Sequence, residues 1–169
     1  MALEAIRYQT GNLQILNQLK LPHQTEYDEV KDSKDGWHAI KDMRTRGAPA
    51  IAIVAALSLA VELQNTTLSG NAEEVAAFID EKLKYLVTSR PTAVNLADAA
   101  RKLKNIVVNA AKAKEADGTS VSKAYCDAAA QMLIDDVSDN QGIGKYGAEW
   151  IEKRMPGEKV SVLTHCNTG

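Results

Sequence analysis

The chain has 169 residues and a mass of 18.3 kDa, with 45% hydrophobic and 25% charged residues. This composition is typical of a folded domain and excludes a disordered, collagenous or low-complexity chain. Twenty basic and twenty-two acidic residues give a formal net charge of -2, so nucleic acid is not expected as the main partner. The two cysteines, Cys126 and Cys166, do not form a disulfide framework, and no charged-then-apolar leader opens the sequence. These features predict an intracellular protein with reduced thiols.

The first thirty residues have the pattern of short strands. Alternating stretches at Leu3 to Tyr8, Leu13 to Leu16 and Thr25 to Val30 are separated by turn-forming residues. They predict a small antiparallel β meander at residues 1–30.

The period then changes to that of helices. Asp32 or Ser33 caps a first helix, which we expect to end near Arg46-Gly47. Residues 48–63 are apolar at nearly every position, which raises the question of a membrane span. The run is shorter than the roughly 20 residues that a span needs, it contains Glu62, and Pro49 stands where a helix would begin. We therefore predict a helix that is buried on all sides and no membrane partner.

Four more helices are expected after this run, which makes six in all. The first begins after Asn71 and stops before Arg90-Pro91, because the residue before a proline is disfavoured in a helix. Thr92 caps a long helix that ends at Asp117-Gly118. The last two helices are expected after Thr119 or Ser120, over Val121 to Val137, and over Ile143 to Arg154.

A turn at Met155-Pro156-Gly157 is followed by another change of pattern. Val160 to Thr164 reads as a buried strand that runs into a loop. A single strand of this kind has no partner among helices, so it predicts the beginning of a second, α/β domain. The predicted fold is mainly α with a small N-terminal antiparallel β meander: a helical domain at residues 1–157 and the start of a truncated domain at residues 158–169.

Two arginines stand directly before predicted helices. Arg46 precedes Gly47 and Ala48 at the start of the buried helix. Arg90 precedes the long helix that Thr92 is expected to cap. Free amides at a helix start attract anions, and an arginine can bind phosphate with two hydrogen bonds. A plain helix start with a solvent-facing arginine, or a solvated loop between helices, explains the same spacing and stays open at this point.

Cys166 is the third candidate, because it lies just past the predicted strand and before an expected helix. A thiol in that place can have a lowered pKa and act as a nucleophile or an acid/base group. A packed, unreactive cysteine is the alternative, and we expect Cys126 to be structural. His23 and His38 have no acidic or cysteine partner at ligand spacing, so no metal site is predicted. Gly142-Ile143-Gly144 lacks the context of a dinucleotide site.

Four segments together resemble one enzyme family across the whole chain. They are LEAIRY (Leu3 to Tyr8), RTRGAPAI (Arg44 to Ile51), TSRPTAVNL (Thr88 to Leu96) and VLTHCNTG (Val162 to Gly169). The set is similar to the methylthioribose-1-phosphate isomerase family of methionine salvage. The resemblance implies an N-terminal, mostly helical domain, a Rossmann-like second domain, and an active site in the cleft between them.

The resemblance also implies roles for particular residues. By motif, Arg46, Gly47, Ala48 and Arg90 correspond to the phosphate-binding residues of the family and Cys166 to its catalytic cysteine. The catalytic aspartate of the family and its other substrate ligands lie beyond residue 169. We therefore expect the chain to be an incomplete and inactive part of an aldose-ketose isomerase. The implied partner is a small phosphorylated sugar, with no cofactor and no metal.

Further expectations concern the complete enzyme and its rivals. The resemblance implies a homodimer in the cytoplasm, with the nucleus as a second location. Regulatory subunits of the guanine-exchange factor for translation initiation share the architecture and are the alternative, as scaffolds and nucleotide-sugar sensors. Ribose-1,5-bisphosphate isomerase is an enzyme of the same superfamily and a closer relative than these regulatory subunits. A free-standing helical interaction module is the third possibility.

Overall fold

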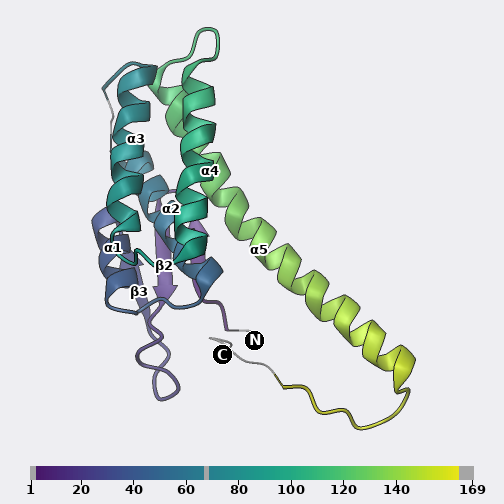
Figure 1. Cartoon of the computed structure of the whole chain (residues 1–169). Helices are drawn as coiled ribbons and strands as arrows, with labels where there is room; N and C mark the ends of the chain where they lie inside the picture. Colours follow the sequence, from purple (N-terminus) through teal and green to yellow (C-terminus); the bar gives the residue numbers. More distant parts are fainter. Residues whose placement is uncertain (1–2, 67–68, 164–169) are drawn as a thin grey trace.

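The computed structural model describes residues 3–66 and 69–163. In this part of the chain a small sheet and five helices form a bundle, and the second half of the last and longest helix projects from it (Figure 1). The elements are β1 (Ile6–Gln9), β2 (Asn12–Leu16), β3 (Tyr27–Val30), α1 (Ser33–Lys41), α2 (Ala48–Asn65), α3 (Ala72–Val87), α4 (Val94–Ala111) and α5 (Gly118–Arg154). The predicted class, mainly α with an N-terminal antiparallel β meander, is confirmed.

The three strands form an antiparallel sheet in the order β1-β2-β3. Gly11, with φ 78°, makes the tight turn between β1 and β2. Leu13 pairs with Val30, and Ile6 pairs with Ile15. Leu13, Ile15 and Val30 are buried. The sheet therefore has one apolar face, and it packs this face on the helices.

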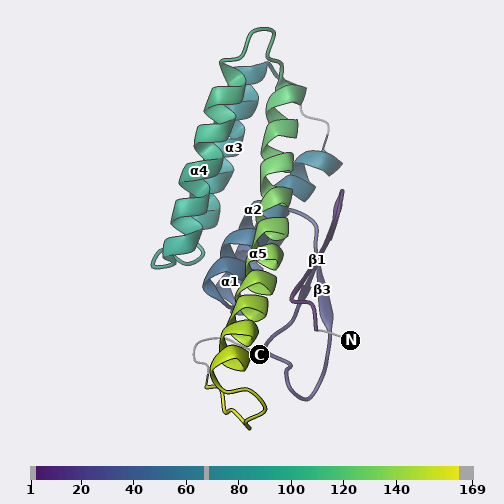
Figure 2. The same cartoon turned by 90° about the vertical axis from the view of Figure 1, so that its right-hand side faces the viewer.

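Helix α2 is the centre of the molecule. Figure 2 shows it between the sheet on one side and α3 and α4 on the other, with α5 beside it. Residues 51–61 of α2 are all buried, as expected for a helix that is apolar all round. By length and composition α2 could also cross a membrane, with a mean hydropathy of 1.5, but 67% of it is buried inside the molecule. This burial is that of a core helix.

Two helix starts agree with the sequence and four boundaries do not. The Asp32 side chain caps α1, and Asn71 forms a capping box with Glu74 at the start of α3. The first helix ends at Lys41 and not near Arg46-Gly47, because Met43 takes a left-handed conformation with φ 61°.

The expected cap of α4 by Thr92 is wrong. The helix begins at Val94 after Ala93, with no side-chain cap, and it ends at Ala111 and not at Asp117-Gly118. Helix α5 begins at Gly118, two or three residues earlier than expected from Thr119 or Ser120 as caps. Asp117 is its cap, because the aspartate oxygen accepts from Ser120 N at 2.7 Å.

The two last predicted helices are one helix of 37 residues. The described chain therefore has five helices and not six. Gly142 and Gly144 lie within this helix, and neither has a positive φ. A helical glycine costs only about 1 kcal/mol relative to alanine, so without a proline the hydrogen bonding continues through both positions.

The strand expected at Val160 to Thr164 is not confirmed. Residues 158–163 are in no helix or strand, and Val162 and Leu163 are 77% and 96% exposed. A strand needs a hydrogen-bonded neighbour, and the three strands of the described part pair only with one another. Residue 164 lies outside the described residues, as does the loop expected after it.

Candidate functional site

Arg46 lies at the end of the connection between α1 and α2, and this connection is firmly held. Thr45 is buried and its amide donates to Ala39 O at 3.2 Å. The neighbouring Arg44 binds the Asp28 carboxylate of β3 at 2.7 Å. Arg46 is half-buried, and its Nε donates to Met43 O at 3.2 Å. The backbone that carries the guanidinium is therefore fixed from both sides.

Gly47 joins this connection to α2. Its φ of 96° is strained for any side chain, so the residue type follows from the turn. Gly47 supplies no side-chain cap, and Pro49 occupies the first turn of α2. The amides at the start of α2 are thus left for a partner outside the helix.

Arg90 lies in the connection between α3 and α4, which is braced from α1. Trp37 Nε1 donates to Thr88 Oγ1 at 2.9 Å, and the Trp37 ring stacks on Tyr85 with 5.8 Å between centroids. Ser89 is buried and its hydroxyl donates to Leu86 O at 2.6 Å. The residues directly before Arg90 are therefore fixed, and the arginine itself is half-buried.

The two arginine segments lie at the same end of the bundle. Helices α2 and α4 both begin there (Figure 1). Pro49, in the first turn of α2, and Val94, the first residue of α4, line one cavity. These two helices have no side-chain cap, whereas α1, α3 and α5 each have one. Among the described residues, neither Arg46 nor Arg90 forms an ion pair. Two uncapped helix starts and two unpaired guanidinium groups together favour an anion.

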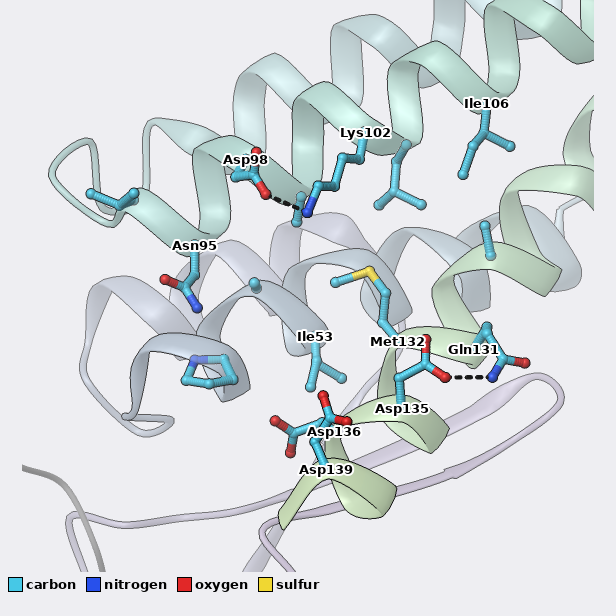
Figure 3. A pocket seen from close by; sticks show the side chains of 16 residues that line it. Ile53, Asn95, Asp98, Lys102, Ile106, Gln131, Met132, Asp135, Asp136 and Asp139 are labelled. Atoms are coloured by element: carbon cyan, nitrogen blue, oxygen red, sulfur yellow. Dashed lines mark hydrogen bonds and ion pairs between the residues drawn. The ribbon is translucent and has the colours of Figure 1, made fainter. Parts of the chain in front are cut away.

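The cavity between α2, α4 and α5 has a volume of about 610 Å³ (Figure 3). Its lining is part apolar and part acidic: Pro49, Ala52, Ile53, Val94, Asn95, Asp98, Ala99, Lys102, Leu103, Ile106, Ala128, Gln131, Met132, Asp135, Asp136 and Asp139. None of the expected phosphate-binding residues Arg46, Gly47, Ala48 and Arg90 belongs to this lining. The two arginine segments, which precede Pro49 and Val94, therefore lie outside the lining, and we call this edge of the cavity the rim.

The carboxylates of the cavity do not suit a phosphate. Hydrogen bonds from Lys102 and Arg101 lower the pKa of Asp98, and both cations are occupied by it at 2.7 and 2.6 Å. Burial raises the pKa of Asp136, and the nearby Asp139 raises it further. A phosphate would be repelled from this wall, so the anion site is limited to the rim. The sequence analysis did not single out these aspartates, although Asp136 and Asp139 are spaced to share one face of a helix.

The predicted catalytic residue Cys166 lies outside the described residues, and so does its neighbour His165. Cys126 is buried in α5, where its thiol lies 3.7 Å from Ala60 O. Burial raises the pKa of this thiol to about 11. Its surroundings are those expected of a structural cysteine. Within the described residues no group of three His, Cys, Asp or Glu side chains could hold a metal ion.

Comparison with known proteins defines the class. Residues 44–169 match the Initiation factor 2 subunit family, and the chain belongs to that family. Two similar proteins carry the name of a specific enzyme. The methylthioribose-1-phosphate isomerase of Pyrenophora tritici-repentis is 65% identical over 172 residues, and the one of Zea mays is 53% identical over 169 residues. These alignments cover 100% and 99% of this chain but only 44% and 46% of the relatives, so the chain spans about half of their length.

Solved structures give the same architecture. The 5-methylthioribose 1-phosphate isomerase from Pyrococcus horikoshii OT3 matches with a TM-score of 0.79 and 27% identity. The translation initiation factor eIF-2B subunit delta from A. fulgidus matches with a TM-score of 0.76 and 28% identity. Each match covers 88% of this chain, and it covers 40% and 42% of the two solved chains respectively. The fold is therefore shared by an isomerase and by a translation factor subunit.

Proposed function

We propose that this chain is the phosphate-holding part of an enzyme that isomerises 5-methylthioribose 1-phosphate to 5-methylthioribulose 1-phosphate in methionine salvage. The observation that carries the proposal is the rim described above, where unpaired Arg46 and Arg90 stand beside two uncapped helix starts. The names of the relatives that are 65% and 53% identical supply the substrate.

The reaction explains why a phosphate must be held. The sugar is locked as its anomeric phosphate, so the ring has to open before C1 and C2 exchange oxidation state. One proton is added to the ring oxygen, one is removed from the 2-hydroxyl, and the hydrogen on C2 moves to C1, as a proton or as a hydride. The isomerisation has no net redox change. The arginines neutralise the phosphate and hold it in place while these bonds change.

We assign the acid/base work to Cys166 together with an aspartate that the relatives carry beyond the segment aligned here. This assignment rests on the HCNTG motif. Residues 1–169 supply only one of these two groups, so we expect this segment by itself to bind the phosphate end of the substrate without producing ketose.

The alternative is a regulatory subunit of the translation-initiation type. The A. fulgidus structure favours it as strongly as the P. horikoshii structure favours the isomerase, because their TM-scores are nearly equal. The 65% identity to an isomerase supports the enzyme over the regulatory subunit. We further propose a homodimer for the full-length protein and a cytoplasmic location with a nuclear fraction, which fractionation of tagged cells would test.

Anion binding can be tested on the chain itself by calorimetric titration with methylthioribose 1-phosphate. Arg46→Ala and Arg90→Ala should each weaken binding by about 10-fold to 100-fold, since a charged hydrogen bond contributes roughly 1.5 to 3 kcal/mol. Arg101→Ala is the matched control, because this arginine is exposed and already paired with Asp98. Unchanged affinity in both rim variants would contradict the assignment of the site.

Catalysis can be tested in a chimera. The N-terminal 44% of the P. tritici-repentis isomerase is replaced by this chain, and ketose formation is measured. We expect turnover, and Cys166→Ser in the chimera should reduce kcat by at least about 100-fold with little change in substrate affinity. A chimera that folds, as judged by circular dichroism, but produces no ketose would favour the regulatory alternative.

A further inference from the structure

Helix α1 contacts both segments that carry the candidate phosphate-binding arginines. It packs against α2, which follows Arg46, and against α3, which precedes Arg90 (Figure 1). Its end leads into the connection that carries Arg46, and its Trp37 side chain reaches the connection that carries Arg90. Helix α1 therefore joins two segments that lie far apart in the sequence.

Arg90 is oriented through its backbone. Its amide donates to Val87 O at 3.3 Å, and its carbonyl accepts from Ala93 N at 2.9 Å. Its guanidinium forms no hydrogen bond or ion pair with the described residues. The position of this guanidinium therefore depends on where the connection between α3 and α4 lies.

Trp37 ties that connection to α1. Its Nε1 donates to Thr88 Oγ1 at 2.9 Å, and Thr88 Oγ1 in turn donates to Tyr85 O at 2.6 Å. The Trp37 ring stacks on Tyr85 with 5.8 Å between the centroids and 17° between the planes. Thr88 is thus held from α1 and from α3, two residues before Arg90.

Arg46 is held at the end of α1. The amides of Arg44 and Thr45 both donate to Ala39 O, at 3.0 and 3.2 Å, so the chain folds back on the last turn of the helix. Met43 lies at this fold with φ 61°, and its carbonyl accepts from Arg46 Nε at 3.2 Å. The two terminal nitrogens of Arg46 have no partner among the described residues, so they are left for an anion.

We propose that α1 sets the spacing of the two arginines, with Trp37 as the positioning residue for Arg90 and Met43 as the positioning residue for Arg46. The inference rests on the proposed function, because it requires both guanidinium groups to bind one phosphate. Groups that are already in place lose less conformational entropy on binding. Trp37 and Met43 therefore strengthen phosphate binding through the arginines and not as ligands.

Trp37 can be tested by titrating the 169-residue chain with methylthioribose 1-phosphate, followed by NMR, in three backgrounds: wild type, Arg46→Ala and Arg90→Ala. Trp37→Phe keeps a ring beside Tyr85 and removes the hydrogen-bond donor. It should weaken binding about 3-fold to 10-fold in the wild type and in Arg46→Ala, less than the loss of an arginine. In Arg90→Ala it should change the affinity by less than about 2-fold, because the group that it positions is gone.

Matched variants separate the hydrogen bond from the packing. Thr88→Val removes the hydroxyl at similar volume and should weaken binding as Trp37→Phe does, whereas Thr88→Ser keeps the acceptor and should bind like the wild type. Trp150→Phe is the control, because this tryptophan is 54% exposed in the projecting half of α5 (Figure 1). Equal weakening by Trp37→Phe in all three backgrounds overturns the proposal, since a general loss of structure would give that result.

Met43 has the converse test. Valine is disfavoured at a positive φ, whereas asparagine tolerates it. Met43→Val should weaken binding in the wild type and in Arg90→Ala but not in Arg46→Ala, and Met43→Asn should bind like the wild type. If circular dichroism shows that Met43→Val is unfolded, Met43→Ala takes its place with the same expected order, because alanine is less disfavoured there than valine.

The wild type distinguishes the two levels of the argument. A wild-type chain without affinity for the sugar phosphate overturns the proposed function and this inference together. If the wild type binds and both arginine variants bind more weakly, but Trp37→Phe and Met43→Val bind as tightly as the wild type, only the positioning role of α1 is overturned and the phosphate site stands.

Discussion

Helices α1 and α2 approach each other closely at Gly36, and this contact gives a sharp test of the packing. A Cβ added at Gly36 would lie 2.2 Å from Ser58 Oγ and 2.5 Å from Ser58 Cβ. Ser58 is fully buried and its hydroxyl donates to Ala55 O at 2.8 Å. The hydroxyl can rotate away from a new methyl group, but the Cβ of Ser58 cannot. Gly36→Ala therefore forces the two helices apart.

The net cost follows from two opposing effects. Overpacking of a buried contact costs about 1 to 3 kcal/mol. Alanine in place of glycine inside a helix returns up to about 1 kcal/mol. Because carbon atoms normally stay about 3.5 to 4.0 Å apart, the helices must separate by more than 1 Å, which favours the upper part of the range. We expect Gly36→Ala to lower the free energy of unfolding by about 1 to 2 kcal/mol.

The assay is equilibrium unfolding in urea, followed by circular dichroism. Adding Ser58→Gly to Gly36→Ala should recover most of the loss, since the methyl group then fits the space of the removed side chain. Adding Ser58→Ala should recover little, because the Cβ remains. If Gly36→Ala is as stable as the wild type, or if Ser58→Ala rescues as well as Ser58→Gly, the contact does not set the spacing of these helices.

Three other results are expected. Lys82→Met should destabilise the chain by about 1 to 3 kcal/mol in urea unfolding, because the Lys82 ammonium lies 2.5 Å from the largely buried Glu62 carboxylate and the variant leaves that carboxylate without its cation. Lys84→Met is the control, because it changes a more exposed ion pair. A loss for Lys82→Met no larger than that for Lys84→Met would contradict this. Asp136→Asn should stabilise the chain at pH 7, because burial and Asp139 raise the pKa of Asp136 in the folded state. The folded state binds the proton more tightly than the unfolded state, so the gain in stability should shrink as the pH falls through the folded pKa and vanish below about 3.8. A gain that is constant with pH would refute this cause. In a Cys166→Ser background, alkylation of Cys126 at pH 8 should be slow in the folded chain and fast in urea, because burial raises its thiol pKa to about 11; equal rates would show an accessible thiolate.

The sequence by itself determined the elements that depend on local chemistry. The alternating strands, the caps at Asp32 and Asn71 and the buried character of α2 each follow from a few neighbouring residues. Periodicity and capping are short-range signals, so they survive without knowledge of the fold. The same holds for the two arginines before helix starts, whose motif indicated an anion site.

Only the tertiary structure decided how distant segments meet. Nothing local in the sequence places Thr88 beside Trp37, or the beginnings of α2 and α4 on one cavity. The pattern predicted two separate helices between residues 121 and 154, but they form one helix, because continuous backbone hydrogen bonding outweighs the modest cost of glycine in a helix. Whether an arginine is paired, or a helix face is covered, depends on packing between elements far apart in the chain. Those are the features that define the rim site.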